Sequence, residues 1–282
     1  MKFGIYVSPT PDAGLFGDLA AAIEEAGFDS VFIPEHTHVP VDVEQLRPAG
    51  SLAHDTFAGA DPFVHLTVAA TKTERLLLGT GAALLTERDP IILAKIASSV
   101  DQLSRGRLIL GLGAGWNHAE LRNHGIDPEA RWSVWEEKLA ALRAIWTQDV
   151  AEFAGTHVSF GPLRQLPKPY RDPYPPLLMS ANGPSAIRKA VAAGMQGWQP
   201  VLLPGVEPFA MGERISFLRE LEGEGDGMEV TVLDFTGVAG PDAIAVRERE
   251  GVDRLVFRIA AAPVAEFSSD LAAHATAVSS FR

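Results

Sequence analysis

Short runs of apolar residues alternate with longer amphipathic stretches along the chain. Consecutive aliphatic residues fill two of these runs, ERLLLGTG at 74–81 and GRLILGLG at 106–113, which is typical of parallel strands buried on both faces. Gly27, Gly194 and Gly251 stand just before apolar runs, where a helix commonly ends in a left-handed residue. The pattern predicts eight strands, at residues 3–7, 30–34, 75–80, 107–112, 176–180, 196–200, 229–235 and 254–259.

Helical patterns separate most of these strands. Asp89, Gly183 and Gly240 are each followed by proline, which predicts that a helix begins at each place. The helix after Asp89 is predicted to bury an apolar stripe made of Ile92, Ile96, Ser99 and Leu103. Because strand and helix alternate up to the eighth strand, we predict the α/β class and a (β/α)8 TIM barrel. A doubly wound open sheet is the alternative.

The whole chain, residues 1–282, is predicted to form a single domain, since one barrel needs roughly 250 residues and no linker divides the sequence. Residues 150–175 lack helical periodicity and are predicted to be an insertion with a short hairpin before the fifth strand. Residues 37–60 are predicted to form a long polar loop, and such loops are commonly lids or mobile segments.

Composition excludes several classes of protein and of site. The absence of cysteine excludes disulfides, thiolate metal sites and a cysteine nucleophile. A net charge of −12 without a basic patch argues against nucleic acid as a partner. Charged residues interrupt the apolar runs before the roughly 18 residues of a membrane helix, and residues 1–9 do not resemble a signal peptide. We therefore expect a soluble, cytoplasmic protein without a membrane partner.

The active site of a barrel lies at the carboxyl ends of its strands. The residues that follow the predicted strands include few charges and many glycines and small polar side chains, which suits a flat heteroaromatic ligand. They are Ser8, Pro9, Glu35, His36, Thr80, Gly81, Gly113, Gly115, Trp116, Asn117, Ser180, Ala181, Asn182, Gly183, Gln199, Gly237, Ala260, Ala261 and Ala262.

The segment LILGLGAGWNHAE at 108–120 raises the question of what its glycines admit. Trp116 occupies the place of the third glycine in the dinucleotide fingerprint, so the segment departs from that motif. Gly113 and Gly115 would let a ring lie against the backbone with Trp116 beside it. A tight turn with Trp116 in the core explains the same residues equally well. Residues 180–183 precede a helix whose free N–H groups suit a phosphate.

His36 is the most plausible proton donor or hydrogen-bond partner, because histidine titrates near neutral pH. Glu35, His36 and His38 also suggest a metal site, but Asn182 and Gln199 follow the next strands instead of further ligands, so we predict no metal. Charged residues around the third helix are expected to form structural ion pairs, namely Arg88, Lys95, Asp101 and Arg107.

A stretch of 40 residues at 87–126 strongly resembles the luciferase-like monooxygenase superfamily, in particular its branch that uses the deazaflavin coenzyme F420: ERDPIILAKIASSVDQLSRGRLILGLGAGWNHAELRNHGI. Further matching segments are FIPEH at 32–36, GTGAALL at 79–85, PPLLMSANGPSAIRKA at 175–190 and GVDRLVFRI at 251–259.

This resemblance implies a barrel that holds a reduced flavin or deazaflavin across the strand ends. It places Glu35 and His36 near the reactive ring as catalytic residues, and it implies a cis peptide bond between Gly81 and Ala82. The residues expected to bind the cofactor are Gly81, Ala82, Gly113, Gly115, Trp116, Asn117, Glu120, Ser180, Asn182, Gly183 and Ser185.

The leading hypothesis is an F420-dependent oxidoreductase that transfers a hydride between the deazaflavin and a small organic substrate, while His36 handles the proton. The first alternative is an FMN-dependent monooxygenase that uses dioxygen and a flavin-reducing partner enzyme. The second is a barrel that binds a cofactor or ligand without turnover. The resemblance also implies a homodimer.

Overall fold

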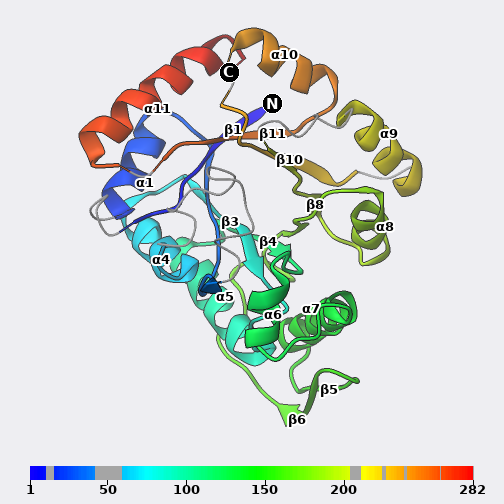
Figure 1. Ribbon diagram of the computed structural model, residues 1–282. Helices are drawn as coiled ribbons and strands as arrows, with labels where there is room; N and C mark the ends of the chain where they lie inside the picture. The colour runs from blue at the N-terminus through cyan, green and yellow to red at the C-terminus, as the bar shows by residue number, and fades with distance from the viewer. Residues whose placement is uncertain are drawn as a thin grey trace.

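The computed structural model describes residues 1–10, 16–41, 59–203, 211–223, 227–237, 240–260 and 262–281. Within these ranges, eight parallel strands form a closed barrel with helices on its outer side (Figure 1). The sheet closes because the strand Glu229–Asp234 pairs on one side with Gly197–Trp198 and on the other with Arg254–Arg258. In chain order the barrel strands are β1 (Lys2–Tyr6), β2 (Ser30–Ile33), β3 (Leu77–Leu84), β4 (Leu108–Gly113), β7 (Leu177–Met179), β8 (Gly197–Trp198), β10 (Glu229–Asp234) and β11 (Arg254–Arg258).

The predicted (β/α)8 barrel and its eight strands are confirmed, each within a few residues. The sixth predicted strand is divided, because β8 is followed by a separate short strand, β9 (Val201–Leu202), which also pairs with β10. β3 is longer than predicted and has a register shift between Thr80 and Ala83. Every residue of β4 is buried, as expected for a parallel strand covered by helices.

The helices begin where the proline signals predict. Asp89 accepts a hydrogen bond from the Ile92 amide at 2.9 Å and caps the helix that starts at Pro90, while Gly183 and Gly240 occupy the caps before Pro184 and Pro241. The described helices are α1 (Phe16–Glu25), α4 (Pro62–Lys72), α5 (Pro90–Ser104), α6 (His118–Asn123), α7 (Arg131–Thr147), α8 (Pro184–Ala192), α9 (Met211–Glu222), α10 (Pro241–Arg249), α11 (Val264–Val278) and the 3₁₀ turn η2 (Ser279–Phe281).

The predicted buried stripe of α5 is wrong. Ile92 and Leu103 are each 58% exposed. The buried face lies next to the predicted stripe and includes two alanines; its residues are Leu93, Ala94, Ala97, Val100 and Asp101. Both rows have helical spacing, so periodicity alone does not distinguish them. Alanines let the helix approach its neighbours closely, and this advantage does not appear in a count of large apolar residues.

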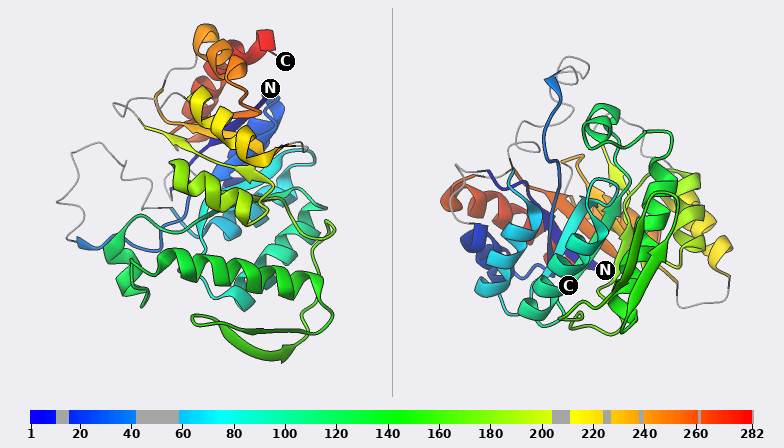
Figure 2. Two further views of the ribbon diagram at one scale, coloured as in Figure 1. Left: turned by 90° about the vertical axis from the view of Figure 1, so that its right-hand side faces the viewer. Right: turned by 90° about the horizontal axis from the view of Figure 1, so that it is seen from below.

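The insertion before β7 contains the predicted hairpin, formed by β5 (Ala151–Ala154) and β6 (Ser159–Leu163). Figure 2 shows this hairpin beside α7. The chain then returns along α5, where Lys95 donates to the Leu166 carbonyl and the Asp101 carboxylate accepts from the Arg171 amide at 2.9 Å. These two α5 charges thus have the expected structural role, but the expected ion pairs are wrong for them, because among the described residues both bond main-chain groups. Of the predicted loop at 37–60, residues 42–58 lie outside the described residues.

Candidate active site

His36 and Glu120 form a hydrogen-bonded pair at the carboxyl ends of β2 and β4. His36 Nδ1 lies 2.7 Å from Glu120 Oε2, and both side chains are buried. Glu120 Oε1 accepts a second hydrogen bond from the Thr37 amide at 3.1 Å. A carboxylate beside Nδ1 orients the imidazole and favours the tautomer that carries its hydrogen on Nδ1. We assign this tautomer to His36 from its contact with Glu120. The arrangement leaves His36 Nε2 as the nitrogen suited to exchange a proton.

The start of α6 positions Glu120. The Asn117 side chain caps this helix by accepting from the Ala119 and Glu120 amides, at 3.1 Å and 3.3 Å. Trp116 is 39% exposed, so the interpretation of this residue as core is wrong. Its ring meets the His36 ring at 72° with the centroids 5.5 Å apart. The turn after β4 thus brings an aromatic surface and a buried carboxylate to the same histidine.

The two glycines of this turn have different structural roles, which gives a first prediction. Gly115 has φ of 77°, and a Cβ there would lie 3.0 Å from the Leu121 side chain. A Cβ on Gly113 would make only ordinary contacts, the nearest at 3.6 Å. We expect Gly115→Ala to lower the free energy of unfolding by about 1–3 kcal/mol, and Gly113→Ala to leave it nearly unchanged. Urea denaturation of both variants checks this; equal losses would contradict it.

Glu35 is buried between the ends of β2 and β3, and both of its carboxylate oxygens bond other groups of the protein. One of its oxygens pairs with Arg88, and the other accepts from the Leu84 amide at 2.7 Å. Arg88 also bonds Asp61, at 2.6 Å. Burial raises the pKa of the Glu35 carboxyl, and Arg88 opposes that shift. The structure therefore places Glu35 where it holds the end of β3, and the expected ion pairing of Arg88 is confirmed.

The floor of the site contains the expected backbone feature. The peptide bond between Gly81 and Ala82 is cis. Gln199, which follows β8, is fully buried, and its side chain lies against Gly111 of β4, where an added Cβ would collide with it. Buried polar side-chain atoms without a hydrogen-bond partner among the described residues occur at three strand ends. They are Ser8 Oγ, Asn117 Nδ2 and both amide atoms of Gln199.

The segment after β7 is used mainly for structure. The Asn182 amide makes two hydrogen bonds of 2.9 Å with the backbone of Val201, so it ties this segment to β9. The Ser180 amide continues the pairing with β4 by donating to the Leu112 carbonyl at 3.0 Å. Ser185 lies on the outside, in a groove between α7 and α8. Gly183 lies at the amino end of α8, where the first N–H groups of the helix begin.

Two residues near the site are absent from the sequence prediction. Arg214 of α9 lies near the start of α8, since a Cβ on Gly183 would lie 3.9 Å from its Nη1 atom. Glu87 is buried beside the His36–Glu120 pair, where burial, then the charges of Glu120 and Glu35, raise its pKa to about 8. No local pattern marks either residue, because both acquire their surroundings only when separate elements meet.

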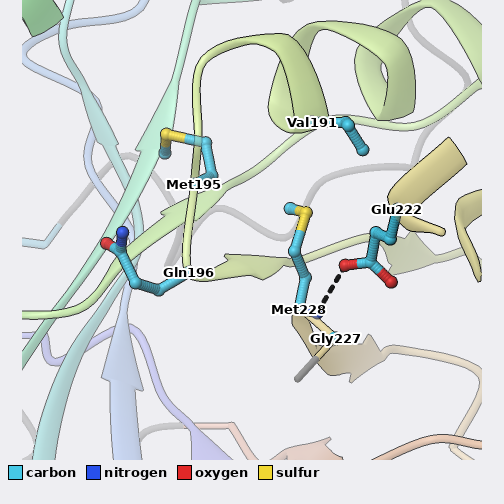
Figure 3. A pocket seen from close by; sticks show the side chains of 6 residues that line it. All are labelled: Val191, Met195, Gln196, Glu222, Gly227 and Met228. Carbon is cyan, nitrogen blue, oxygen red and sulfur yellow. Dashed lines mark hydrogen bonds between the residues drawn. The ribbon is translucent and has the colours of Figure 1, made fainter. Parts of the chain in front are cut away.

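A cavity of about 370 Å³ lies at the opposite end of the barrel, before β8 and β10 (Figure 3). It is lined by Val191, Met195, Gln196, Glu222, Gly227 and Met228. Glu222 already accepts from the Met228 amide and from Arg219 at 2.8 Å. Because active sites of such barrels lie at the carboxyl ends of the strands, we assign no catalytic role to this cavity.

The fold is a closed TIM barrel that carries a histidine–carboxylate pair at the carboxyl ends of its strands. Residues 1–275 match the family model described as luciferase-like monooxygenase, and the chain belongs to this family. No helix in the described ranges combines the length and apolar character needed to cross a membrane.

The curated relatives span most of the chain. An uncharacterised protein of Mycobacterium tuberculosis is 36% identical over 265 residues, which is 91% of each chain. An F420-dependent glucose-6-phosphate dehydrogenase of Beutenbergia cavernae is 30% identical over 248 residues, which is 82% of this chain and 70% of the relative.

Solved structures share the fold at lower identity. Monooxygenase RslO1 of Streptomyces bottropensis superposes with a TM-score of 0.80 at 22% identity, over 100% of this chain and 99% of that one. An F420-dependent secondary alcohol dehydrogenase in complex with an F420–acetone adduct superposes with a TM-score of 0.78 at 16% identity, over 100% of this chain and 99% of that one. A type II Baeyer–Villiger monooxygenase of Pseudomonas putida in complex with FMN superposes with a TM-score of 0.66 at 19% identity, over 83% of this chain and 66% of that one.

Proposed function

We propose that this protein is an F420-dependent oxidoreductase that interconverts a small alcohol and its carbonyl compound. The observation that carries the proposal is the His36–Glu120 pair, held at the strand ends beside Trp116. The names of two similar proteins support it, since one relative is an F420-dependent dehydrogenase and one structural neighbour is an F420-dependent alcohol dehydrogenase. A cytoplasmic homodimer that depends on a separate cofactor-reducing enzyme is part of the same proposal.

The residues present fit a flat deazaflavin. Buried polar atoms of Ser8, Asn117 and Gln199, which have no hydrogen-bond partner in the described part of the chain, lie at strand ends, where the ring's carbonyl and N–H groups need partners. Arg214 and the amino end of α8 supply positive charge suited to the cofactor's phosphate. When bound, the deazaflavin supplies two-electron hydride chemistry.

The role of His36 in this reaction is to hold the substrate oxygen and its proton. For an alcohol, Nε2 takes the O–H proton as hydride leaves the adjacent carbon; in the reverse direction it returns the proton to the oxygen. Glu120 stabilises the imidazolium that forms, because its carboxylate already bonds Nδ1. Trp116 excludes water from one side of the imidazole.

Titration of the purified protein with F420 and, separately, with FMN tests the proposal by fluorescence. We expect stoichiometric binding of F420 and weaker binding of FMN. Binding of FMN without measurable affinity for F420 would overturn the proposal and favour the flavin monooxygenase. Failure of both titrations would instead favour a barrel that binds another ligand.

Arg214→Ala should weaken F420 binding about tenfold, because the phosphate loses one charge-assisted contact. Binding of the phosphate-free deazaflavin fragment should stay unchanged. Isothermal titration of both ligands measures the effect, with Arg122→Ala on α6 as a control that removes one cation elsewhere. An equal loss for both ligands would contradict the assignment of Arg214 to the phosphate.

A further inference from the structure

Glu87 lies in the turn between β3 and α5, and its carboxyl group is buried among the groups that hold His36. The side chain is 2% exposed, and neither oxygen has a hydrogen-bond partner among the described residues. A buried carboxylate without donors is strongly unfavourable, whereas a buried carboxylic acid is tolerated. The geometry therefore favours the protonated form of Glu87.

The cations nearest to Glu87 are bonded to other groups. Lys138 of α7 donates to the main-chain carbonyls of the two residues that flank Glu87, Thr86 at 2.5 Å and Arg88 at 2.7 Å. The Arg88 guanidinium pairs with Glu35 and Asp61. His124 Nε2 lies 3.4 Å from Glu87 Oε2, but burial and then the neighbouring His38 lower the pKa of His124, so this ring is neutral at pH 7.

A chain of contacts leads from Glu87 to His36. His124 Nε2 also lies 2.7 Å from Thr37 Oγ1, and the Thr37 amide donates to Glu120 Oε1 at 3.1 Å. The other oxygen of Glu120 bonds His36. Glu87 and Glu120 thus occupy one buried region, and two carboxyl groups in such a region resist being charged together.

We propose that Glu87 is a positioning residue that stays a neutral acid, so that of these two carboxyl groups Glu120 alone is charged beside His36. This inference rests on the proposed function, in which His36 exchanges a proton with the substrate. The charged groups around Glu87 are Glu120 from α6, Glu35 from the end of β2, Lys138 from α7 and the adjacent Arg88, and the titratable His124 at the carboxyl-terminal cap of α6 also faces it.

Ionisation of Glu87 changes the charge that His36 experiences. Above about pH 8 a second negative charge arises behind Glu120, and it makes the electrostatic potential at the imidazole more negative. Below that pH Glu87 is neutral, so when His36 accepts a proton from the substrate, the negative charge of Glu120 matches the positive charge of the imidazolium. Glu87 therefore sets the pH above which the negative charge around His36 increases.

Histidine-selective NMR of the protein without cofactor tests this coupling. His36 resonances are assigned with His36→Asn, and the pH is raised from about 6 to about 10. In the wild type we expect a step in the His36 shifts with a midpoint near pH 8, where Glu87 loses its proton. The step should vanish in Glu87→Gln and persist in Glu87→Asp. The exposed Glu129→Gln, which removes a distant carboxylate, should leave it unchanged.

Identical His36 titrations in the wild type and in Glu87→Gln would overturn the proposal. Should Glu87→Gln fail to fold, infrared spectra of the wild type decide the matter: a protonated-carboxyl band must fade between about pH 7 and 9 as the His36 shifts change. A fading band without a simultaneous change at His36 would also overturn it. Neither measurement uses F420, so failure of the F420 titration would reject the proposed function and leave this coupling standing.

Discussion

His36→Ala is expected to lower kcat by about 10²–10⁴-fold, because the variant lacks the group that exchanges a proton with the substrate oxygen. The Kd for F420 should change little, since the imidazole is held by Glu120 and Trp116 rather than being part of the phosphate site. The measurement follows F420 absorbance with a panel of small ketones and secondary alcohols, using those that the wild type converts.

His38→Ala is the matched control for this prediction. His38 lies two residues away and bonds Thr37 Oγ1 and Asn123, so its loss removes a neighbouring imidazole without touching the His36–Glu120 pair. We expect less than a threefold change in kcat. If both variants lose activity equally, or if His36→Ala keeps the wild-type kcat, His36 does not transfer the proton.

The fold was largely predictable from the sequence because its signals are local. The consecutive aliphatics at 108–112 can be buried on both faces only in a covered sheet, and Asp89 with Pro90 marks a helix start within a few residues. The buried face of α5 was not predictable, because Ile92 and Leu93 lie on rows with the same spacing. Which row faces inward depends on how closely the neighbouring elements approach.

The candidate site likewise contains residues that the sequence identifies and residues that it does not. His36 was identified by its place after β2, and Glu120 by resemblance, but their contact joins residues 84 positions apart. Glu87 looks like an ordinary turn residue until α6 and α7 surround it, and Arg214 lies near α8 only through the packing of α9. Burial and charge at such positions come from tertiary structure, and no sequence window contains them.

Arg88→Met is expected to lower the free energy of unfolding by about 3–5 kcal/mol at pH 7, because it leaves a buried carboxylate without its cation. Glu35 is 5% exposed, and of its bonds within the described ranges it would keep the hydrogen bond from the Leu84 amide. Urea denaturation measures the loss. Arg164→Met is the control, since Arg164 and Asp149 pair with side chains 67% and 82% exposed, and its effect should stay within about 0.5 kcal/mol.

The pH dependence of this loss distinguishes a buried charge from lost packing. Burial already raises the pKa of Glu35, and removal of Arg88 raises it further. An acid whose pKa is higher in the folded state binds more protons folded than unfolded, so folding becomes less favourable as pH rises above the unfolded value, about 4.3. The loss of unfolding free energy caused by Arg88→Met should therefore shrink as pH falls from 7 to about 5.

Adding Glu35→Gln to Arg88→Met should restore much of the stability at pH 7, since no buried charge then remains at that position. A deficit that is constant with pH and unrelieved in the double variant would mean that Arg88 acts through its packing on Phe63, whose ring centroid lies 4.8 Å from the guanidinium carbon.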